Sequence, residues 1–202
     1  MTVEVYADVA CPFAQVGLRR FVERRRELGR DDVLLRVRAW PLELVNGAPH
    51  DPRAMADEVD EIRDQVASDL FVDFQESSFP RSTLAAMTLA SAAYGKDDAT
   101  GEAVSLQLRD LLFERGVDVS DPSVLARVAE EHGLTADLSD DTSVRSDHEA
   151  GLARGVVGSP HFFTPNGDYF CPALDVAKDD GGHLRVRPDP VALGRFIDAC
   201  FD

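Results

Sequence analysis

The stretch VEVYADVACPFAQVG, residues 3–17, decides the fold of this chain. Its β-branched and aromatic start predicts a short strand over Val3 to Tyr6, and a helix follows in which Pro12 occupies the first turn. Cys11 therefore stands between the end of a strand and the start of a helix. Unpaired backbone N–H groups and the positive end of the helix dipole stabilise a thiolate at such a position. We expect a lowered pKa for Cys11 and a reactive thiol.

This motif has one thiol where a redox pair would have two. A C-x-x-C spacing places a second cysteine within reach of the first, and Ala14 occupies that position here. The remaining cysteines, Cys171 and Cys200, are too scattered to predict a disulfide framework. No pair of cysteines has metal-ligand spacing either, so we expect no metal site. The sequence predicts a monothiol motif.

The composition is that of an acidic protein with enough apolar residues for a core. The chain has 202 residues, 44% of them hydrophobic, and a formal net charge of −16. That charge repels nucleic acid and anionic membrane surfaces, so neither is an expected partner. There is no signal peptide and no apolar run of about 18 residues, which favours a cytoplasmic location. Thiols stay reduced there, and a role in donating disulfides to secreted proteins is disfavoured.

The order of the elements predicts an α/β frame interrupted by helices. Residues 33–40 form a second strand, which completes a βαβ unit with Cys11 at the carboxyl end of its first strand. Open α/β sheets usually bind ligands at that edge. Over 51–139 the apolar residues recur with a helical period. A hairpin over 161–171, with an Asn-Gly turn, and a last helix from Asp189 then resume the frame.

Three segments give the chain a resemblance to the DsbA-like family of thioredoxin-fold proteins. Residues 8–17, DVACPFAQVG, resemble the D-x-x-C-P-W-C-x-x-G opening of FrnE-type members, with Ala14 at the second cysteine. Residues 38–44, RAWPLEL, look like the aromatic-Pro segment that closes their second strand. Residues 155–162, GVVGSPHF, are similar to the G-V-x-G-V-P-x-F loop, in which these proteins carry a cis-proline beside the active-site cysteine.

This resemblance implies an α/β fold of DsbA-like type. A thioredoxin-like domain is expected over 1–50 and 140–202, with an inserted all-helical subdomain over 51–139. A cis bond at Ser159-Pro160 would turn the main chain of Ser159 toward an extended thiol peptide, which could pair with it as an extra strand. The same architecture serves 2-hydroxychromene-2-carboxylate isomerase and kappa-class glutathione transferase, which hold a low-molecular-weight thiol. Fold alone does not choose between these activities.

The candidate site follows from the motif and the resemblance. Cys11 is the expected catalytic thiol, and Asp8 is expected to bond loop N–H groups in a structural role. Cys171 is expected in the core of a hairpin strand, with a distant resolving role as the alternative, and Cys200 in packing or at the surface. The residues expected to hold a substrate or small thiol are Pro12, Phe13, Ala14, Trp40, Ser159, Pro160 and His161.

Three functions fit these residues. The first is a DsbA-like thiol-disulfide oxidoreductase that acts through Cys11 with an external low-molecular-weight thiol, such as glutathione, and has no permanently bound cofactor. The second is an isomerase or transferase in which Cys11 orients a bound thiol, with Phe13, Trp40 and Leu42 lining the cleft. The third is a non-catalytic binding module. The expected partners are a small thiol or a cysteine-containing peptide or protein, with a homodimer left open.

Overall fold

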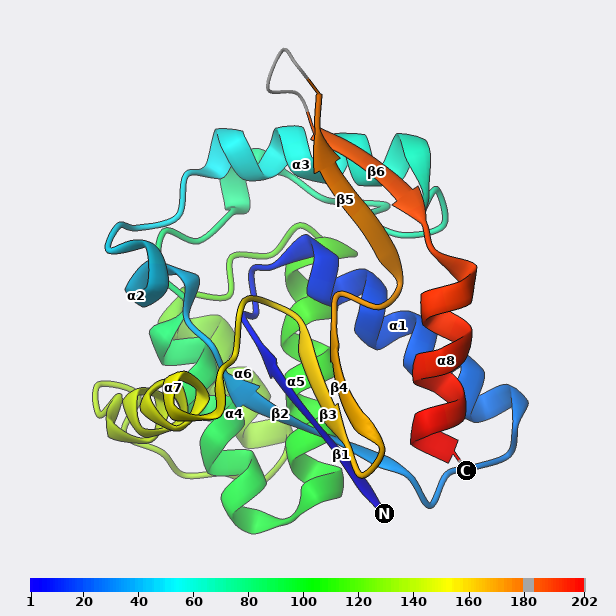
Figure 1. The fold of residues 1–202 in the computed structure, drawn as a ribbon. Coiled ribbons are helices and arrows are strands. Elements are labelled where there is room, and N and C mark those ends of the chain that lie inside the picture. Colours follow the sequence, from blue (N-terminus) through cyan, green and yellow to red (C-terminus); the bar gives the residue numbers. More distant parts are fainter. Residues whose placement is uncertain (180–183, 202) are drawn as a thin grey trace.

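The computed structural model describes residues 1–179 and 184–201 and has a mixed sheet at its centre (Figure 1). The sheet has four strands in the order β2-β1-β3-β4. β1 pairs in parallel with β2, and the other two pairings are antiparallel. β1 is thus an inner strand, and the loop after it lies in the middle of the sheet's edge. The strands are β1 Thr2–Ala7, β2 Leu34–Ala39, β3 His161–Thr164 and β4 Gly167–Phe170.

Helices make up most of the remaining structure. Between β2 and β3 the chain contains helices and no strand, which fits the predicted helical segment. None of the described helices combines the length and the apolar character that a membrane span requires. The helices are α1 Pro12–Glu27, α2 Leu42–Asn46, α3 Pro52–Gln65, the 3-10 helix η1 Glu76–Ser78, α4 Leu84–Lys96, α5 Asp98–Phe113, α6 Pro122–Glu131, α7 Thr142–Arg154 and α8 Pro190–Phe201.

One side of the sheet is covered by α1 and α8, which lie next to each other in Figure 1. Their interface is aromatic: the ring of Phe21 in α1 lies 5.2 Å from that of Phe201 and 6.1 Å from that of Phe196 in α8. Phe162 of β3 completes the contact, with its ring 4.5 Å from Phe196. Cys200 is buried in the same cluster, which agrees with its predicted packing role. This core holds α1, and with it the start of the helix, against the sheet.

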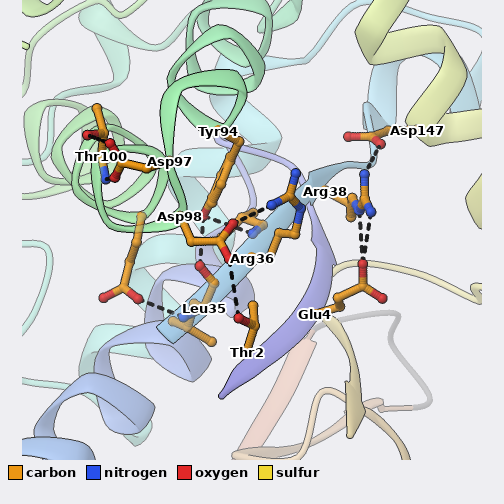
Figure 2. A network of polar contacts seen from close by, with 12 residues as sticks. Thr2, Glu4, Leu35, Arg36, Arg38, Tyr94, Asp97, Asp98, Thr100 and Asp147 are labelled. Atoms are coloured by element: carbon orange, nitrogen blue, oxygen red, sulfur yellow. Dashed lines mark hydrogen bonds and ion pairs between the residues drawn. The ribbon is translucent and has the colours of Figure 1, made fainter. Parts of the chain in front are cut away.

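β2 is an edge strand whose outer backbone groups are paired by side chains of the helices (Figure 2). Glu102 of α5 accepts from the N–H of Leu35 at 2.6 Å. The hydroxyl of Tyr94 in α4 accepts from the N–H of Val37 at 2.9 Å and donates to the carbonyl of Leu35 at 3.0 Å. Asp147 of α7 accepts from the N–H of Ala39 at 3.1 Å. The helical segment therefore pairs with these outer groups of β2 in the place of a further strand.

A second, two-stranded sheet was not predicted from the sequence. β5, Leu174–Lys178, pairs with β6, Leu184–Pro188, in an antiparallel arrangement, and the hairpin packs on α3 through a bond from Val186 N–H to the side-chain oxygen of Gln65 at 2.9 Å. Few of its side chains are buried, so the alternation that marks a strand is weak. α3 ends at Gln65, although apolar residues continue beyond it at Val66 and Leu70.

The bonds that Tyr94 makes to β2 predict the effect of removing one oxygen atom. Tyr94→Phe leaves two buried backbone groups of an edge strand without partners, so we expect a loss of about 2–4 kcal/mol in the free energy of unfolding. Urea denaturation measures it. Tyr169→Phe is the matched control, because the Tyr169 hydroxyl makes no hydrogen bond to the described residues and should cost under about 0.5 kcal/mol. Equal losses in the two variants would contradict the role given to Tyr94.

Candidate active site

Cys11 lies where the loop after β1 meets the loop before β3. It is the N-cap residue of α1 and is only 2% exposed. Its Sγ donates a hydrogen bond to the carbonyl oxygen of Ser159 at 3.2 Å, although 148 positions separate the two residues in sequence. The peptide bond between Ser159 and Pro160 is cis. The fold thus brings the motif cysteine and the proline loop together.

The surroundings of Cys11 contradict the lowered pKa expected from the helix start. Burial raises the pKa of the Cys11 thiol from 9.0 to about 12, and the negative charges of Asp8 and Glu58 add to the rise. Hydrogen bonds from Ser159 and the Ala14 backbone oppose it. A helix terminus contributes about 0.3–2 kcal/mol, whereas a rise from 9.0 to about 12 corresponds to about 4 kcal/mol against the thiolate. Loss of hydration therefore outweighs the helix dipole, and the closed site holds a neutral thiol.

Asp8 holds the loop after β1 in place. Its carboxylate is fully buried and accepts from the N–H of Ala10 at 2.8 Å and from that of Leu42 at 2.6 Å. The hydroxyl of Thr83 donates a third bond at 3.0 Å, and His50 Nε2 lies 3.6 Å away. Burial raises the pKa of Asp8, while the charge of His50 and the three donors oppose the rise. Asp8 therefore joins the loop to the segment after β2 and to the helical segment.

Arg109 of α5 is a part of the site that the sequence patterns did not reveal. It is 1% exposed, and its guanidinium donates to the carbonyl of Asp8 at 3.1 Å and to the carbonyl and hydroxyl of Ser105 at 2.9 and 2.7 Å. Burial lowers the pKa of Arg109 to about 10, and the charges of Asp8 and Cys11 oppose the decrease. A signal was present, because Arg109 lies three and four positions before Leu112 and Phe113, on the buried side of its helix. A charge at such a position indicates a buried cation.

The cis-proline loop also contacts a second cysteine. Cys171 lies one residue beyond β4, not inside the predicted strand, and its backbone N–H donates to the carbonyl of Pro160 at 2.9 Å. It is 8% exposed and has a φ of 46°, a left-handed conformation that is uncommon for a residue other than glycine. Burial raises the pKa of Cys171 to about 12, and the charge of Cys11 raises it further. Both cysteines are free thiols.

Trp40, predicted as a binding residue, lies apart from the thiol. It is 2% exposed, and its ring meets that of Tyr6 edge-on at 6.2 Å. A methyl group on Gly151 of α7 would come within 2.6 Å of the Trp40 ring, so the helix passes directly over it. Trp40 and Tyr6 belong to a cluster separate from the one that contains Cys11. A role for Trp40 in binding remains a prediction without a direct contact to the thiol.

His161 is occupied by contacts within the fold. It is 3% exposed, its Nδ1 accepts from the N–H of Val157 at 3.3 Å, and its Nε2 lies 3.0 Å from a carboxylate oxygen of Asp168. Because Nδ1 accepts, Nε2 carries the proton and donates to Asp168. This arrangement orients the ring along β3. The predicted hydrogen bond from His161 into the site is not among its contacts here.

The three residues after Cys11 form the first turn of α1. Pro12 begins the helix and is buried, and Ala14 is completely buried, so the position of the absent second cysteine lies in the core. Phe13 is half-buried and packs against both the cluster that contains Cys11 and the cluster that contains Cys171. Phe13 and Leu193 are the partly buried apolar side chains that contact both clusters. Among the described residues no group of three His, Cys, Asp or Glu side chains is arranged to hold a metal ion.

Comparison with known proteins agrees with this architecture. The family model of the DSBA-like thioredoxin domain matches residues 2–178 of the chain. None of the curated proteins matches it. Among solved structures, 2-hydroxychromene-2-carboxylate isomerase superposes with a TM-score of 0.61 at 17% identity, covering 84% of this chain and 88% of the isomerase.

Two further structures have the same fold. A probable DsbA oxidoreductase from Streptomyces coelicolor superposes with a TM-score of 0.59 at 23% identity, covering 80% of this chain and 79% of that one. The cytosolic disulfide reductase DsbM from Pseudomonas aeruginosa, in its structure with GSH, superposes with a TM-score of 0.57 at 13% identity, covering 98% and 92%. The predicted thioredoxin-like fold with a helical insertion is therefore confirmed.

The buried thiol of Cys11 predicts how stability depends on pH. Its pKa is raised from 9.0 to about 12 in the folded protein, so above pH 9 the unfolded chain loses the Cys11 proton first. The thiol's contribution is complete below pH 9 and falls as pH rises toward 12, with a slope of up to about 1.4 kcal/mol per pH unit. Urea denaturation between pH 8.5 and 10.5 should give Cys11→Ala a shallower decline than the unsubstituted protein. Identical slopes would contradict the burial of Cys11 as a neutral thiol.

Proposed function

This chain belongs to the DSBA-like thioredoxin-domain family, and we propose that it is a thiol-disulfide oxidoreductase acting through the single thiol of Cys11 with an external low-molecular-weight thiol. One observation carries the proposal. The sulfur of Cys11 lies 3.2 Å from the carbonyl oxygen of Ser159, the residue before cis-Pro160. One thiol and one main-chain platform are thus adjacent, and Ala14 supplies no second sulfur beside them.

Binding of an extended substrate would activate the thiol. A peptide that pairs with the main chain of Ser159 places an N–H group at the carbonyl that now accepts from Cys11. That N–H competes with the thiol for the Ser159 carbonyl, so the hydrogen bond that favours the neutral form is weakened. The positive charge of Arg109 interacts favourably with a Cys11 thiolate and becomes its counter-charge. Glutathione has peptide N–H groups of the kind that this platform would pair.

Burial also removes one property of a strong disulfide donor. A protein thiol becomes a strong oxidant when its reduced form is stabilised, and a sulfur with a low pKa leaves a disulfide readily. Burial raises the pKa of Cys11 to about 12, so its thiolate is a poor leaving group. The site therefore lacks the low-pKa leaving sulfur that favours donation of disulfides.

The proposed reaction has two exchange steps. The Cys11 thiolate attacks one sulfur of a disulfide RSSR, forms the mixed disulfide Cys11–S–S–R and releases RS⁻, which takes up a proton. An external thiol R′SH, as its thiolate, then attacks the sulfur of R, releases Cys11 and leaves as R′SSR. The sum is RSSR + R′SH giving RSH + R′SSR, with the electron pair supplied by the external thiol. Cys11 ends as it began.

Further observations support an external thiol and a reducing location for the proposed reaction. DsbM, which has the same fold, is described as a cytosolic disulfide reductase and has a structure with GSH, which supports glutathione or an equivalent as the external thiol. Three thiols that are free in the structure fit a reducing, cytoplasmic location.

We also propose the predicted division of the chain, with 1–50 and 140–202 as the thioredoxin-like domain and 51–139 as an inserted subdomain that contributes Thr83 and Arg109.

One observation favours a second function. A neutral thiol that donates a hydrogen bond, as Cys11 does to Ser159, can equally donate to the thiolate of a bound small thiol and orient it toward an electrophile. This is the chemistry of a thiol-dependent isomerase or transferase, and 2-hydroxychromene-2-carboxylate isomerase has the same fold. In that case Cys11 forms no covalent bond, and a hydroxyl could replace its thiol.

Replacement of the cysteine by serine distinguishes the two functions. We expect Cys11→Ser to reduce a glutathione mixed disulfide of a cysteine peptide, with glutathione as the external thiol, about a thousandfold more slowly than the unsubstituted enzyme. A hydroxyl can donate a hydrogen bond but cannot form the mixed disulfide. Cys200→Ser is the matched control and should keep full turnover, since Cys200 is buried in the last turn of α8. Equal rates for Cys11→Ser and Cys200→Ser would eliminate exchange at Cys11.

A further inference from the structure

Two cysteines, one near each end of the sequence, make hydrogen bonds to the same cis-proline loop. The Sγ of Cys11 donates to the carbonyl of Ser159 at 3.2 Å, and the backbone of Cys171 donates to the carbonyl of Pro160 at 2.9 Å. These two carbonyls belong to consecutive residues. Phe13, two positions after Cys11, packs against the clusters of both cysteines. Nothing in the C-x-x-C spacing signals this neighbourhood, because it is created by the fold.

We propose that Cys171 is the resolving thiol of the site: it attacks the mixed disulfide formed on Cys11 and closes a Cys11–Cys171 disulfide. This inference rests on the proposed exchange at Cys11 and identifies the second sulfur that the motif lacks at Ala14. The external thiol then acts one step later, on the internal disulfide. A monothiol motif would in this way belong to a two-thiol site.

The chemistry balances without a further oxidant. Glutathione disulfide and the Cys11 thiolate give Cys11–S–S–glutathione and a first glutathione thiolate. The Cys171 thiolate attacks Cys11 Sγ, the bond to glutathione breaks, and a second glutathione thiolate leaves with the electron pair. Two protein thiols are oxidised to one disulfide, one glutathione disulfide is reduced to two glutathione molecules, and the two protons pass from the cysteines to the products. Two external thiols reverse the oxidation.

The backbone at Cys171 is suited to such a change. Cys171 is the first residue after an edge strand, and its φ of 46° is held by the bond to Pro160 and by a bond from the N–H of Leu174 to its own carbonyl at 3.2 Å. A disulfide needs Cα atoms about 4.4–6.8 Å apart, and any adjustment toward that distance falls on the short loop 171–173. A residue outside the usual backbone regions, in a loop between two sheets, can supply that adjustment.

The electrostatics disfavour two thiolates at the site. Burial and, secondarily, the negative charge that Cys11 carries when ionised raise the pKa of Cys171 to about 12. In the mixed disulfide Cys11 cannot ionise, so only burial then opposes the loss of the Cys171 proton.

Trapping with glutathione disulfide tests the proposal on the whole protein. The reduced protein is incubated with glutathione disulfide, quenched with acid and mapped by peptide mass spectrometry without reductant. We expect the unsubstituted protein to lose two hydrogens and to give a Cys11–Cys171 linked peptide. Cys171→Ser should stop at the first step and accumulate about tenfold more glutathione adduct on Cys11 at the same time point. Cys200→Ser is the control and should behave as the unsubstituted protein.

Each outcome separates this inference from the function on which it rests. A stable adduct on Cys11 at the same level in the unsubstituted protein and in Cys171→Ser overturns the role of Cys171 and leaves exchange at Cys11 standing. No adduct on Cys11 in any of the proteins, with no linked peptide, overturns both. The intact mass of the unsubstituted protein needs no variant, so the result does not depend on how Cys171→Ser folds.

Discussion

The contact between the loop after β1 and the cis-proline loop is the constraint on which the rest of the site depends. Two hydrogen bonds make it, and both end on Ser159: its hydroxyl accepts from the N–H of Asp8 at 3.0 Å, and its carbonyl accepts from the thiol of Cys11 at 3.2 Å. Through this one residue the loop after the first strand is joined to the loop that leads into the β3-β4 hairpin. The thiol is buried because the contact is closed, and its high pKa follows from that burial.

The helical segment completes this contact as well as covering the sheet. Thr83 and Arg109, which come from α4's N-cap and from α5, bond the carboxylate and the carbonyl of Asp8. A buried carboxylate and a buried guanidinium each cost desolvation energy, and each is tolerable here because its hydrogen bonds and the opposite charge nearby offset that cost. The chain has a net charge of −16, and Arg109 is the one fully buried arginine among the described residues. It donates to the carbonyl of Asp8, which lies three positions before Cys11 in the same loop. The helical segment therefore helps to hold the loop that carries Cys11 and places a positive charge beside it.

Local sequence signals were enough for the frame and not for the properties of the site. The strand, Pro12 and the helix period placed Cys11 at a helix start, because these depend on short-range geometry, whereas the Gly-Ser-Pro loop was placed beside it by the resemblance to the DsbA-like family. The raised pKa of Cys11 could not be predicted, since burial depends on contacts with residues 148 positions away. For the same reason the sequence did not predict the contact between Arg109 and the carbonyl of Asp8, or the contact between Cys171 and Pro160. The β5 and β6 strands escaped prediction because most of their side chains face solvent.

Together these features describe a thiol that is buried and neutral at rest and hydrogen-bonded to the carbonyl of Ser159, where the proposed function has a substrate pair. The most direct test is the rate at which glutathione disulfide consumes the free Cys11 thiol in the folded protein, measured by peptide mapping from pH 7 to pH 10. The account predicts that Cys11 reacts and that its rate rises about tenfold per pH unit without reaching a plateau, because the thiol still ionises above this range. A Cys11 that does not react, or a rate that levels off below pH 8, would contradict it.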